Sequence, residues 1–241
     1  MILNLLNLGR IPYADGLDLQ RRLVEARHAE QIGNTLVLLE HPPVLTLGRN
    51  SSRANILASD EFLADRGVEI HEINRGGDVT YHGPGQLVGY PIFDLRSFTP
   101  RLVAVDYVRQ IEEALIRACG DFGVLTARVK GRTGVWIPAG GRLLEKKIAA
   151  IGVHISRGIT SHGFALNVST DLRDFDLIVP CGINDRAVTS LEPEADPAPS
   201  MEAVRNAVAR QFGRVFGHQV LGIESLEELL ASKSVTAPAD L

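Results

Sequence analysis

The chain has 241 residues, 45% of them hydrophobic and 22% charged, which is the profile of a globular protein with one substantial core. Its two cysteines are too few for a disulfide scaffold and too far apart for a zinc site, so we expect reduced thiols and no bound metal. The net charge of -4 argues against a nucleic-acid-binding protein, which usually carries a basic surplus.

The sequence shows no targeting or membrane segment. The amino terminus reaches Arg10 without a basic region followed by a long apolar core, so it does not resemble a signal peptide. Charged residues, Gly or Pro interrupt each apolar stretch before it reaches the roughly eighteen residues of a transmembrane helix. We therefore expect a cytoplasmic protein with no membrane partner.

The first half of the chain predicts several strands and one helix. Leu19, Leu23 and Ala26 recur at helical spacing after Asp15 and Gly16, which predicts a helix through about residue 31. Short apolar runs bounded by Gly, Pro or Asn predict strands. These strands cover residues 2–8, 35–40, 44–47, 68–73 and 86–93, with a glycine-rich turn between the last two.

The second half begins with a long amphipathic helix, on which Val108, Ile111, Leu115 and Cys119 share one apolar stripe. Further predicted strands cover residues 126–129, 134–137, 147–155, 162–167 and 218–221, and further helices cover 200–216 and 225–231. A proline-rich loop at 193–199 precedes the helix predicted at 200–216. Residues 233–241 are expected to form a frayed tail.

Helices and strands alternate without a regular period, and no internal repeat is present. This order predicts an α/β or α+β fold in which a mixed β-sheet is flanked by helices, packed mainly on one of its sides. We expect one catalytic or binding domain spanning residues 1–241.

The strongest local signal is the glycine-rich segment 75–86. Its glycines would let backbone N–H groups approach a ligand, and Arg75, Thr80, His82 and Gln86 supply polar side chains. The segment lacks the Gly-Lys-Ser/Thr ending of a phosphate loop and the third glycine of a dinucleotide fingerprint. An ordinary turn between strands remains the simpler interpretation, in which Arg75 organises the turn and His82 makes a structural hydrogen bond.

Two further residues have the chemistry of a nucleophilic site. Lys147 precedes an apolar run, where a lysine is usually only solvated. Cys181 lies between Pro180 and Gly182 in a turn, where a thiol can be exposed and reactive, whereas Cys119 on its apolar stripe is expected to be a core residue.

Together these segments resemble the lipoyl(octanoyl) transferase family, which shares its fold with biotin and lipoate protein ligases. The resemblance rests on Arg75-Gly76-Gly77-x-x-Thr80-Tyr81-His82-x-x-Gly85-Gln86-x-Val88-x-Tyr90 and, in the same order along the chain as in the family, on segments 40–49, 147–152, 161–167 and 180–182. It covers roughly residues 36–190.

The resemblance implies that Cys181 is the nucleophile that carries an octanoyl thioester and that Lys147 activates it. It also implies a set of substrate-binding residues: Arg75, Gly76, Gly77, Asp78, Val79, Thr80, Tyr81, His82, Ala150, Ile151, Gly152, Gly163, Phe164 and Ala165. The implied donor is octanoyl-acyl carrier protein, and the implied acceptors are the lipoyl domains of 2-oxoacid dehydrogenases and the glycine cleavage H protein. No cofactor and no ATP would be needed.

Two alternatives remain open at this stage. A lipoate or biotin protein ligase would share the fold and a lysine but would use ATP and no cysteine, and a non-catalytic acyl-binding module would keep the fold without turnover. Five cations before or near Lys147 are candidates for docking an acidic carrier, or else form a solvated charged face: Arg128, Lys130, Arg132, Arg142 and Lys146.

Overall fold

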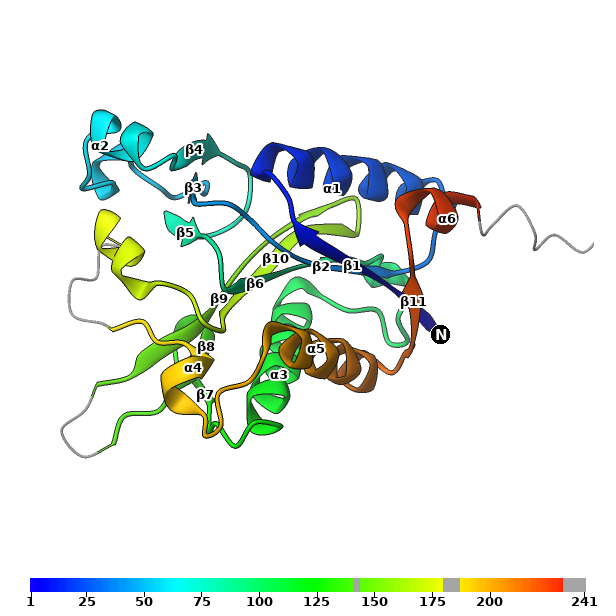
Figure 1. Cartoon of the computed structure of the whole chain (residues 1–241). Coiled ribbons are helices and arrows are strands. Elements are labelled where there is room, and N and C mark those ends of the chain that lie inside the picture. Colours follow the sequence, from blue (N-terminus) through cyan, green and yellow to red (C-terminus); the bar gives the residue numbers. More distant parts are fainter. Residues whose placement is uncertain (141–143, 180–186, 232–241) are drawn as a thin grey trace, which may run out of the picture.

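A computed structural model of the chain describes residues 1–140, 144–179 and 187–231. These residues form a large twisted sheet with helices on both faces and a smaller sheet beside it (Figure 1). Apolar runs of the sequence predict most of the strands in both sheets, and the fold class expected from the sequence is confirmed.

The large sheet has eight strands and mixed pairing. β1 pairs in parallel with β2 and β11, whereas all other neighbours are antiparallel. Their order is β11 (Gln219–Ile223), β1 (Ile2–Arg10), β2 (Thr35–Glu40), β6 (Gln86–Ile92), β10 (Ile159–Asn167), β9 (Lys146–Ser156), β8 (Arg132–Ile137) and β7 (Ala127–Val129).

The small sheet has the order β4 (Glu69–Glu72), β3 (Val44–Leu47) and β5 (Thr80–His82). It packs with two short helical segments, α2 (Asp60–Asp65) and η3 (Leu172–Leu177), around its own apolar cluster, whereas η1 (Arg53–Asn55) between β3 and α2 has no buried residue. The sequence predicted only a turn between β4 and β6. This prediction was wrong for residues 80–82, which form β5. Three residues are too few to show strand periodicity, and β5 forms because β3 offers it a backbone partner.

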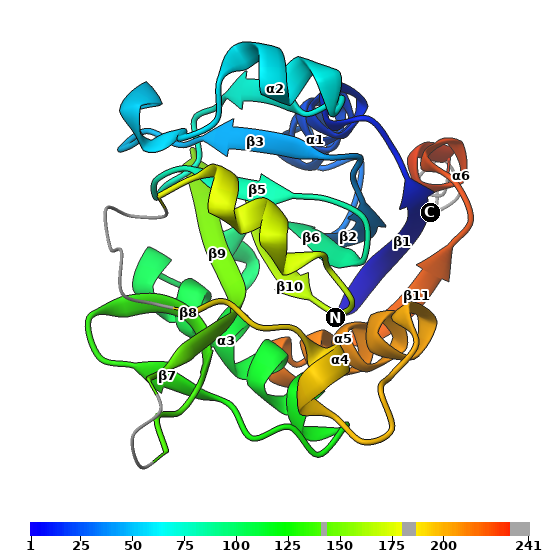
Figure 2. The same ribbon diagram turned by 60° about the vertical axis from the view of Figure 1, so that its left-hand side comes forward.

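Helices cover both faces of the large sheet (Figure 2). Helices α3 (Ala104–Gly120) and α5 (Met201–Phe216) cover one face, and α1 (Tyr13–His28) and α6 (Leu226–Ala231) cover the other. Two short segments, η2 (Leu95–Ser97) and α4 (Leu191–Glu194), complete the order. No helix within the described ranges is long and apolar enough to cross a membrane.

The expectation that helices pack mainly on one side of the sheet was therefore wrong. Leu38 and Leu39, adjacent on β2, are both fully buried but belong to the apolar clusters on opposite faces. Because successive strand residues point to opposite faces, a continuous apolar run such as β2 indicates burial on both. Cys119 is also fully buried, and burial raises the pKa of its thiol to about 12, which confirms it as a core residue.

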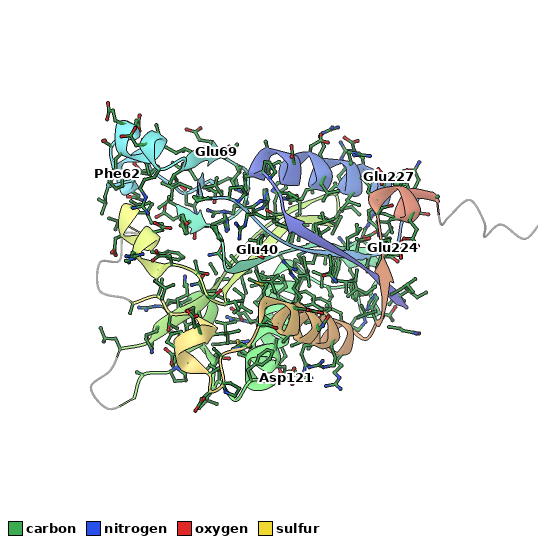
Figure 3. All side chains as sticks on the ribbon, in the orientation of Figure 1. Glu40, Phe62, Glu69, Asp121, Glu224 and Glu227 are labelled. Atoms are coloured by element: carbon green, nitrogen blue, oxygen red, sulfur yellow. The ribbon has the colours of Figure 1, made fainter. Side chains whose placement is uncertain are left out.

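The stacked rings of Phe164, Phe212 and Phe216 join the sheet to α5. We expect Phe212→Ala to lower the free energy of unfolding by about 3–5 kcal/mol, because Phe212 is fully buried and its removal leaves a cavity. The matched control is Phe62→Ala on α2, at the periphery of the molecule in Figure 3, where the side chain is 45% exposed. If urea unfolding showed the same loss of free energy for Phe212→Ala and Phe62→Ala, the packing of Phe212 between the sheet and α5 would be contradicted.

Candidate functional site

A cavity of about 120 Å³ lies between the glycine-rich segment, the small sheet and the strands β6, β9 and β10. Of the predicted site residues that the structure describes, all except Tyr81 line it: Lys147, Arg75, Gly76, Gly77, Asp78, Val79, Thr80, His82, Ala150, Ile151, Gly152, Gly163, Phe164 and Ala165. The tertiary structure thus brings three segments together that are distant in the sequence.

Close backbone contact joins the glycine-rich segment to β9. The Gly76 N–H donates to the Val153 carbonyl over 3.0 Å. A Cβ atom on Gly152 would lie 2.8 Å from the Gly76 carbonyl oxygen, a separation that real Cβ atoms do not adopt. The two backbones can pack at this distance only because residue 152 has no side chain.

Arg75 organises the same segment. Its Nη2 donates to both the carbonyl and the hydroxyl oxygen of Thr46, each over 2.8 Å, and its Nη1 donates to the Gly76 carbonyl over 3.0 Å. The side chain is buried, and its charge lies in the cavity wall. This geometry agrees with the interpretation of Arg75 as an organiser of the turn.

A register shift in β9 orients Lys147. Val135 pairs with Ala149 and Trp136 pairs with Lys147, so one step along β8 matches two steps along β9. The extra residue places Ile148 and Ala149 together in the core under α3, and it turns Lys147 to the cavity face. With strict alternation Lys147 would share the face of Ala149 and point into the apolar core.

Gly134 on β8 makes this shift possible. It has a φ of +125°, and a Cβ there would lie 2.6 Å from the Ala149 carbonyl oxygen. The Lys147 Cε atom lies 3.6 Å from that Cβ position, which is an ordinary van der Waals distance. The Gly134 N–H donates to the fully buried carboxylate of Glu112 on α3, which anchors the strand.

Cys181 lies outside the described residues. The residues on either side of that segment are anchored near the cavity: the Val179 N–H donates to the Asn55 carbonyl over 2.8 Å, and the Ala187 carbonyl accepts from the Lys147 N–H over 3.0 Å. Asn55 in turn donates to the carboxylate of the cavity residue Asp78 over 3.0 Å. Both flanking residues therefore contact the surroundings of Lys147 and Asp78.

A chain of amide hydrogen bonds fixes the tautomer of His82. Asn167 Nδ2 donates to the Thr189 carbonyl, so its Oδ1 accepts from Gln86 Nε2 over 2.9 Å. Gln86 Oε1 must then accept from His82 Nδ1, 2.7 Å away. Neutral His82 therefore carries its proton on Nδ1 and presents a lone pair on Nε2. In this form Nε2 can accept a hydrogen bond from a thiol or an amine but cannot donate one to a carbonyl.

Burial keeps the cavity histidines neutral. It lowers the pKa of His82 to about 3 and, with the nearby charge of Arg75, the pKa of His162 to about 4. Within the described part of the chain, no group of three or more His, Cys, Asp and Glu side chains could hold a metal ion. The cavity therefore combines two neutral imidazoles with the cations Arg75 and Lys147.

Tyr81 points away from the cavity, in contrast to its neighbours on β5. Its side chain is 1% exposed and lies in the cluster of the small sheet, edge-on to Phe175. Its hydroxyl donates to the Asp174 carboxylate on η3 over 2.6 Å. Alternation along β5 explains the difference, since Thr80 and His82 face one side and Tyr81 the other. Tyr81 thus fastens η3, the segment that leads to Val179, against the small sheet.

Several cavity residues were not among the predicted site residues. Tyr13, at the start of α1, and Tyr90, on β6, line the cavity. The Tyr90 hydroxyl donates to His41 Nε2 over 2.6 Å, and His41 Nδ1 donates to the Ile11 carbonyl. Tyr90 and His41 lie in the sequence blocks that carry the family resemblance, which was the available signal, whereas no local pattern marks Tyr13.

Glu40, labelled in Figure 3, joins the turn after β5 to α5. Its Oε2 accepts from the Gly85 N–H over 2.9 Å and its Oε1 accepts from Arg205 Nη2 over 3.0 Å. The turn that carries Gln86 into β6 is thereby fixed to a helix far along the chain.

The candidate carrier-docking cations are largely paired with acids. Arg128 contacts Glu112 and Glu113, Arg132 lies 3.7 Å from Glu145, and Lys146 forms an ion pair with Glu194. Arg142 lies outside the described residues. The local excess of positive charge is therefore smaller than the sequence pattern indicates.

Several solved structures have a fold similar to that of this chain. A putative lipoate protein ligase from T. acidophilum with bound lipoic acid has a TM-score of 0.69 at 18% identity, covering 97% of this chain and 94% of that one. A lipoate-protein ligase A bound with ATP gives 0.69 at 20% identity and the same coverage. A biotin protein ligase from Aquifex aeolicus gives 0.52 at 14%, covering 89% and 70%. The fold is therefore that of the lipoate and biotin protein ligases.

The sequence comparison gives the family. Residues 12–213 match the family model described as the lipoyl protein ligase A/B catalytic domain. An octanoyltransferase from Acidobacterium capsulatum is 76% identical over 237 residues, covering 95% of this chain and 96% of that protein, and one from Koribacter versatilis is 56% identical over 229 residues, covering 95% and 90%. The chain belongs to the lipoyl(octanoyl) transferase family, and it is by that membership an acyltransferase.

The position of Tyr81 leads to a prediction about stability. We expect Tyr81→Phe to lower the free energy of unfolding by about 1.5–3 kcal/mol, because it removes a hydrogen bond to a charged carboxylate. Affinity for octanoate, measured by calorimetry, should be unchanged because the hydroxyl does not face the cavity. A large loss of octanoate affinity with unchanged stability would show instead that Tyr81 contacts the acyl chain.

The buried histidines predict a pH dependence of stability. The folded pKa of His162, about 4, is below the unfolded value of 6.5, so the unfolded chain binds more protons between these pH values. Above pH 6.5, titration of His162 should therefore not reduce the free energy of unfolding. As the pH drops from 6.5 toward 4, it should reduce the free energy of unfolding by up to about 1.4 kcal/mol per pH unit.

Urea unfolding between pH 4.5 and 7 tests this expectation in three proteins. His162→Asn should flatten the slope, and asparagine tolerates the positive φ of 55° found at this position. His28→Gln, at an exposed position on α1, should leave the slope as in the unsubstituted protein. An unchanged slope in His162→Asn would exclude burial of a neutral His162.

Proposed function

We propose that this protein transfers an octanoyl group from octanoyl-acyl carrier protein to a lysine of a lipoyl domain, without ATP, through a thioester on Cys181. The acceptors would be the lipoyl domains of 2-oxoacid dehydrogenases and the glycine cleavage H protein. The observation that supports it best is the register shift in β9, which turns a lysine toward an apolar cavity beside the anchored ends of the segment that contains Cys181.

In the first half-reaction, the Cys181 thiolate attacks the carbonyl carbon of the donor thioester. An ordinary cysteine has a pKa of about 8.5, so a cation is needed to favour the thiolate near neutral pH. Lys147, as an ammonium group, supplies that charge. The new C–S bond forms as the bond to the carrier's sulfur breaks, and the departing sulfur takes a proton from Lys147, leaving the lysine neutral.

In the second half-reaction, neutral Lys147 acts as the base. A free lysine on the acceptor has a pKa of about 10.4 and is almost fully protonated in water, so its attack needs removal of a proton. The acceptor lysine first loses one proton to solvent, and the resulting neutral amine attacks the octanoyl carbonyl carbon. Its second proton passes to Lys147 as the amide forms, and Cys181 leaves as a thiolate. The pair then returns to its starting charges, and the exchange of one thioester for another requires no ATP.

The cavity supplies an apolar wall for the acyl chain. Val79, Val88, Ala150 and Ala165 line it together with the glycine backbone of residues 152 and 163. Burial of six methylene groups would contribute on the order of 5 kcal/mol, at about 0.8 kcal/mol each. We assign the predicted substrate-binding residues to the binding site of the acyl group. Tyr81 is the exception, and we assign it to the support of η3.

The chemical step can be tested by intact mass. After incubation with octanoyl-acyl carrier protein and no ATP, we expect one added octanoyl group on the unsubstituted protein and on Cys119→Ala, and none on Cys181→Ser. The Cys119 thiol is a suitable control because it is buried in the core. Transfer that requires ATP and persists in Cys181→Ser would identify a ligase instead.

The role of Lys147 predicts losses in both half-reactions. We expect Lys147→Ala to slow octanoyl-Cys181 formation and its aminolysis by a lipoyl domain, each by about 10²–10⁴-fold, the usual contribution of a positioned proton-transfer group. Lys146→Ala is the matched control, because Lys146 pairs with Glu194 and does not line the cavity. A normal single-turnover rate for Lys147→Ala in either step would remove the proposed role.

A further inference from the structure

The Lys147 ammonium group lies over the face of an aromatic ring. Its Nζ atom is 4.7 Å from the centroid of the Trp136 ring, and the two residues are directly opposite each other on β8 and β9. Trp136 is only 4% exposed, so much of the ring face is shielded from water. The face of an indole ring carries partial negative charge, which attracts a cation at this distance.

The same register shift that turns Lys147 to the cavity also creates this contact. Val135 and Ala149 pair on the core side, and Trp136 and Lys147 pair on the cavity side only because β9 has one more residue between these pairs than β8. The Gly134 backbone lies beside both side chains, with Trp136 Nε1 and Lys147 Cε each at the ordinary van der Waals distance of 3.6 Å from the position that its Cβ would occupy. The ring is thus held at a fixed place relative to Lys147 by the backbone of two paired strands.

Charged and titratable side chains share the cavity with Lys147 or lie on the segments next to it in the sheet. Those in the cavity wall are Arg75 and Asp78 in the glycine-rich segment, His82 on β5, His162 on β10, Tyr13 and Tyr90. Beside them, Arg132 on β8 lies 6.0 Å from the Trp136 ring and pairs with Glu145, and Lys146 pairs with Glu194 on α4. Burial and, to a smaller extent, the charge of Arg75 lower the pKa of both His82 and His162.

We propose that Trp136 is a positioning residue that stabilises the charged form of Lys147 and holds its ammonium group at the cavity. The inference rests on the proposed function of Lys147 and extends it to a residue that does not line the cavity. Trp136 contacts neither the acyl group nor the acceptor. It sets the free-energy difference between ammonium and amine at residue 147.

The two half-reactions would respond to Trp136 in opposite directions. Thiolate formation at Cys181 needs the ammonium form of Lys147, so loss of the ring should move the thiolate titration to higher pH. Aminolysis needs the neutral amine, which becomes available at lower pH once the ring no longer favours the cation. A purely structural defect would reduce both rates without moving their pH midpoints apart.

The experiment compares the full-length protein with Trp136→Phe and Trp136→Leu. Iodoacetamide modification of Cys181, followed by intact mass between pH 5 and 10, gives the midpoint for the thiolate. Single-turnover aminolysis of octanoyl-Cys181 by a lipoyl domain gives the midpoint for the base. For Trp136→Leu we expect an upward shift of about half to one pH unit in the first and a downward shift of similar size in the second, with smaller shifts for Trp136→Phe.

Two controls separate the possible failures. Phe98→Leu changes a buried ring in the core under α5 and should move neither midpoint. In a Lys147→Ala background, Trp136→Leu should cause no further shift, since the ring would have no ammonium group to stabilise. If circular dichroism shows that Trp136→Leu does not fold, the same comparison of Trp136→Phe with and without Lys147→Ala decides the question.

Midpoints that stay fixed, or that move in the same direction, would overturn the role of Trp136 while leaving the thioester mechanism intact. The proposed function itself fails by a different result: no octanoyl adduct on Cys181, or Lys147→Ala with both pH profiles of the unsubstituted protein. The two failures are therefore distinguishable in one set of samples.

Discussion

One extra residue in β9 determines what this site can do. Strict alternation would place Lys147 on the same face as Ala149, in the apolar core, where an unpaired ammonium group would carry a large desolvation penalty. The register shift between β8 and β9 places it instead at the cavity, opposite Trp136. Gly134 permits the shift because any side chain there would collide with the Ala149 carbonyl. The chemistry proposed for Lys147 thus depends on a local irregularity in an otherwise regular antiparallel pair.

The rest of the cavity is assembled by contacts that join distant segments through backbone atoms. The glycine-rich segment reaches β9 through Gly76 and Gly152, whereas Glu40 fixes the following turn to α5 through Arg205. Gln86 connects His82 on β5 to Asn167 on β10. Backbone and amide contacts of this kind leave few alternative geometries, which suits a site that must hold two reacting groups in register.

The electrostatics follow from the same packing. Arg75 is buried because the oxygens of Thr46 accept its hydrogen bonds, and its charge with burial keeps the histidines neutral. The Lys147 Nζ atom lies 4.7 Å from the centroid of the Trp136 ring, whose face attracts a cation. The cations that the sequence suggested for carrier docking are by contrast mostly engaged with Glu112, Glu145 and Glu194, so they contribute less to a surface field than their number indicates.

The sequence by itself determined most of the residues around the cavity through its resemblance to a known family, and it determined the fold class and most strands and helices through apolar periodicity, which is a local property of the chain. It predicted Cys119 as a core residue for the same reason. Only the tertiary structure decided that helices cover both faces of the sheet, that Tyr81 faces η3 rather than the cavity, and that Lys147 faces Trp136. These facts depend on strand pairing and register between distant residues, and a shift of one residue reverses the direction of a side chain without leaving a mark in the local sequence.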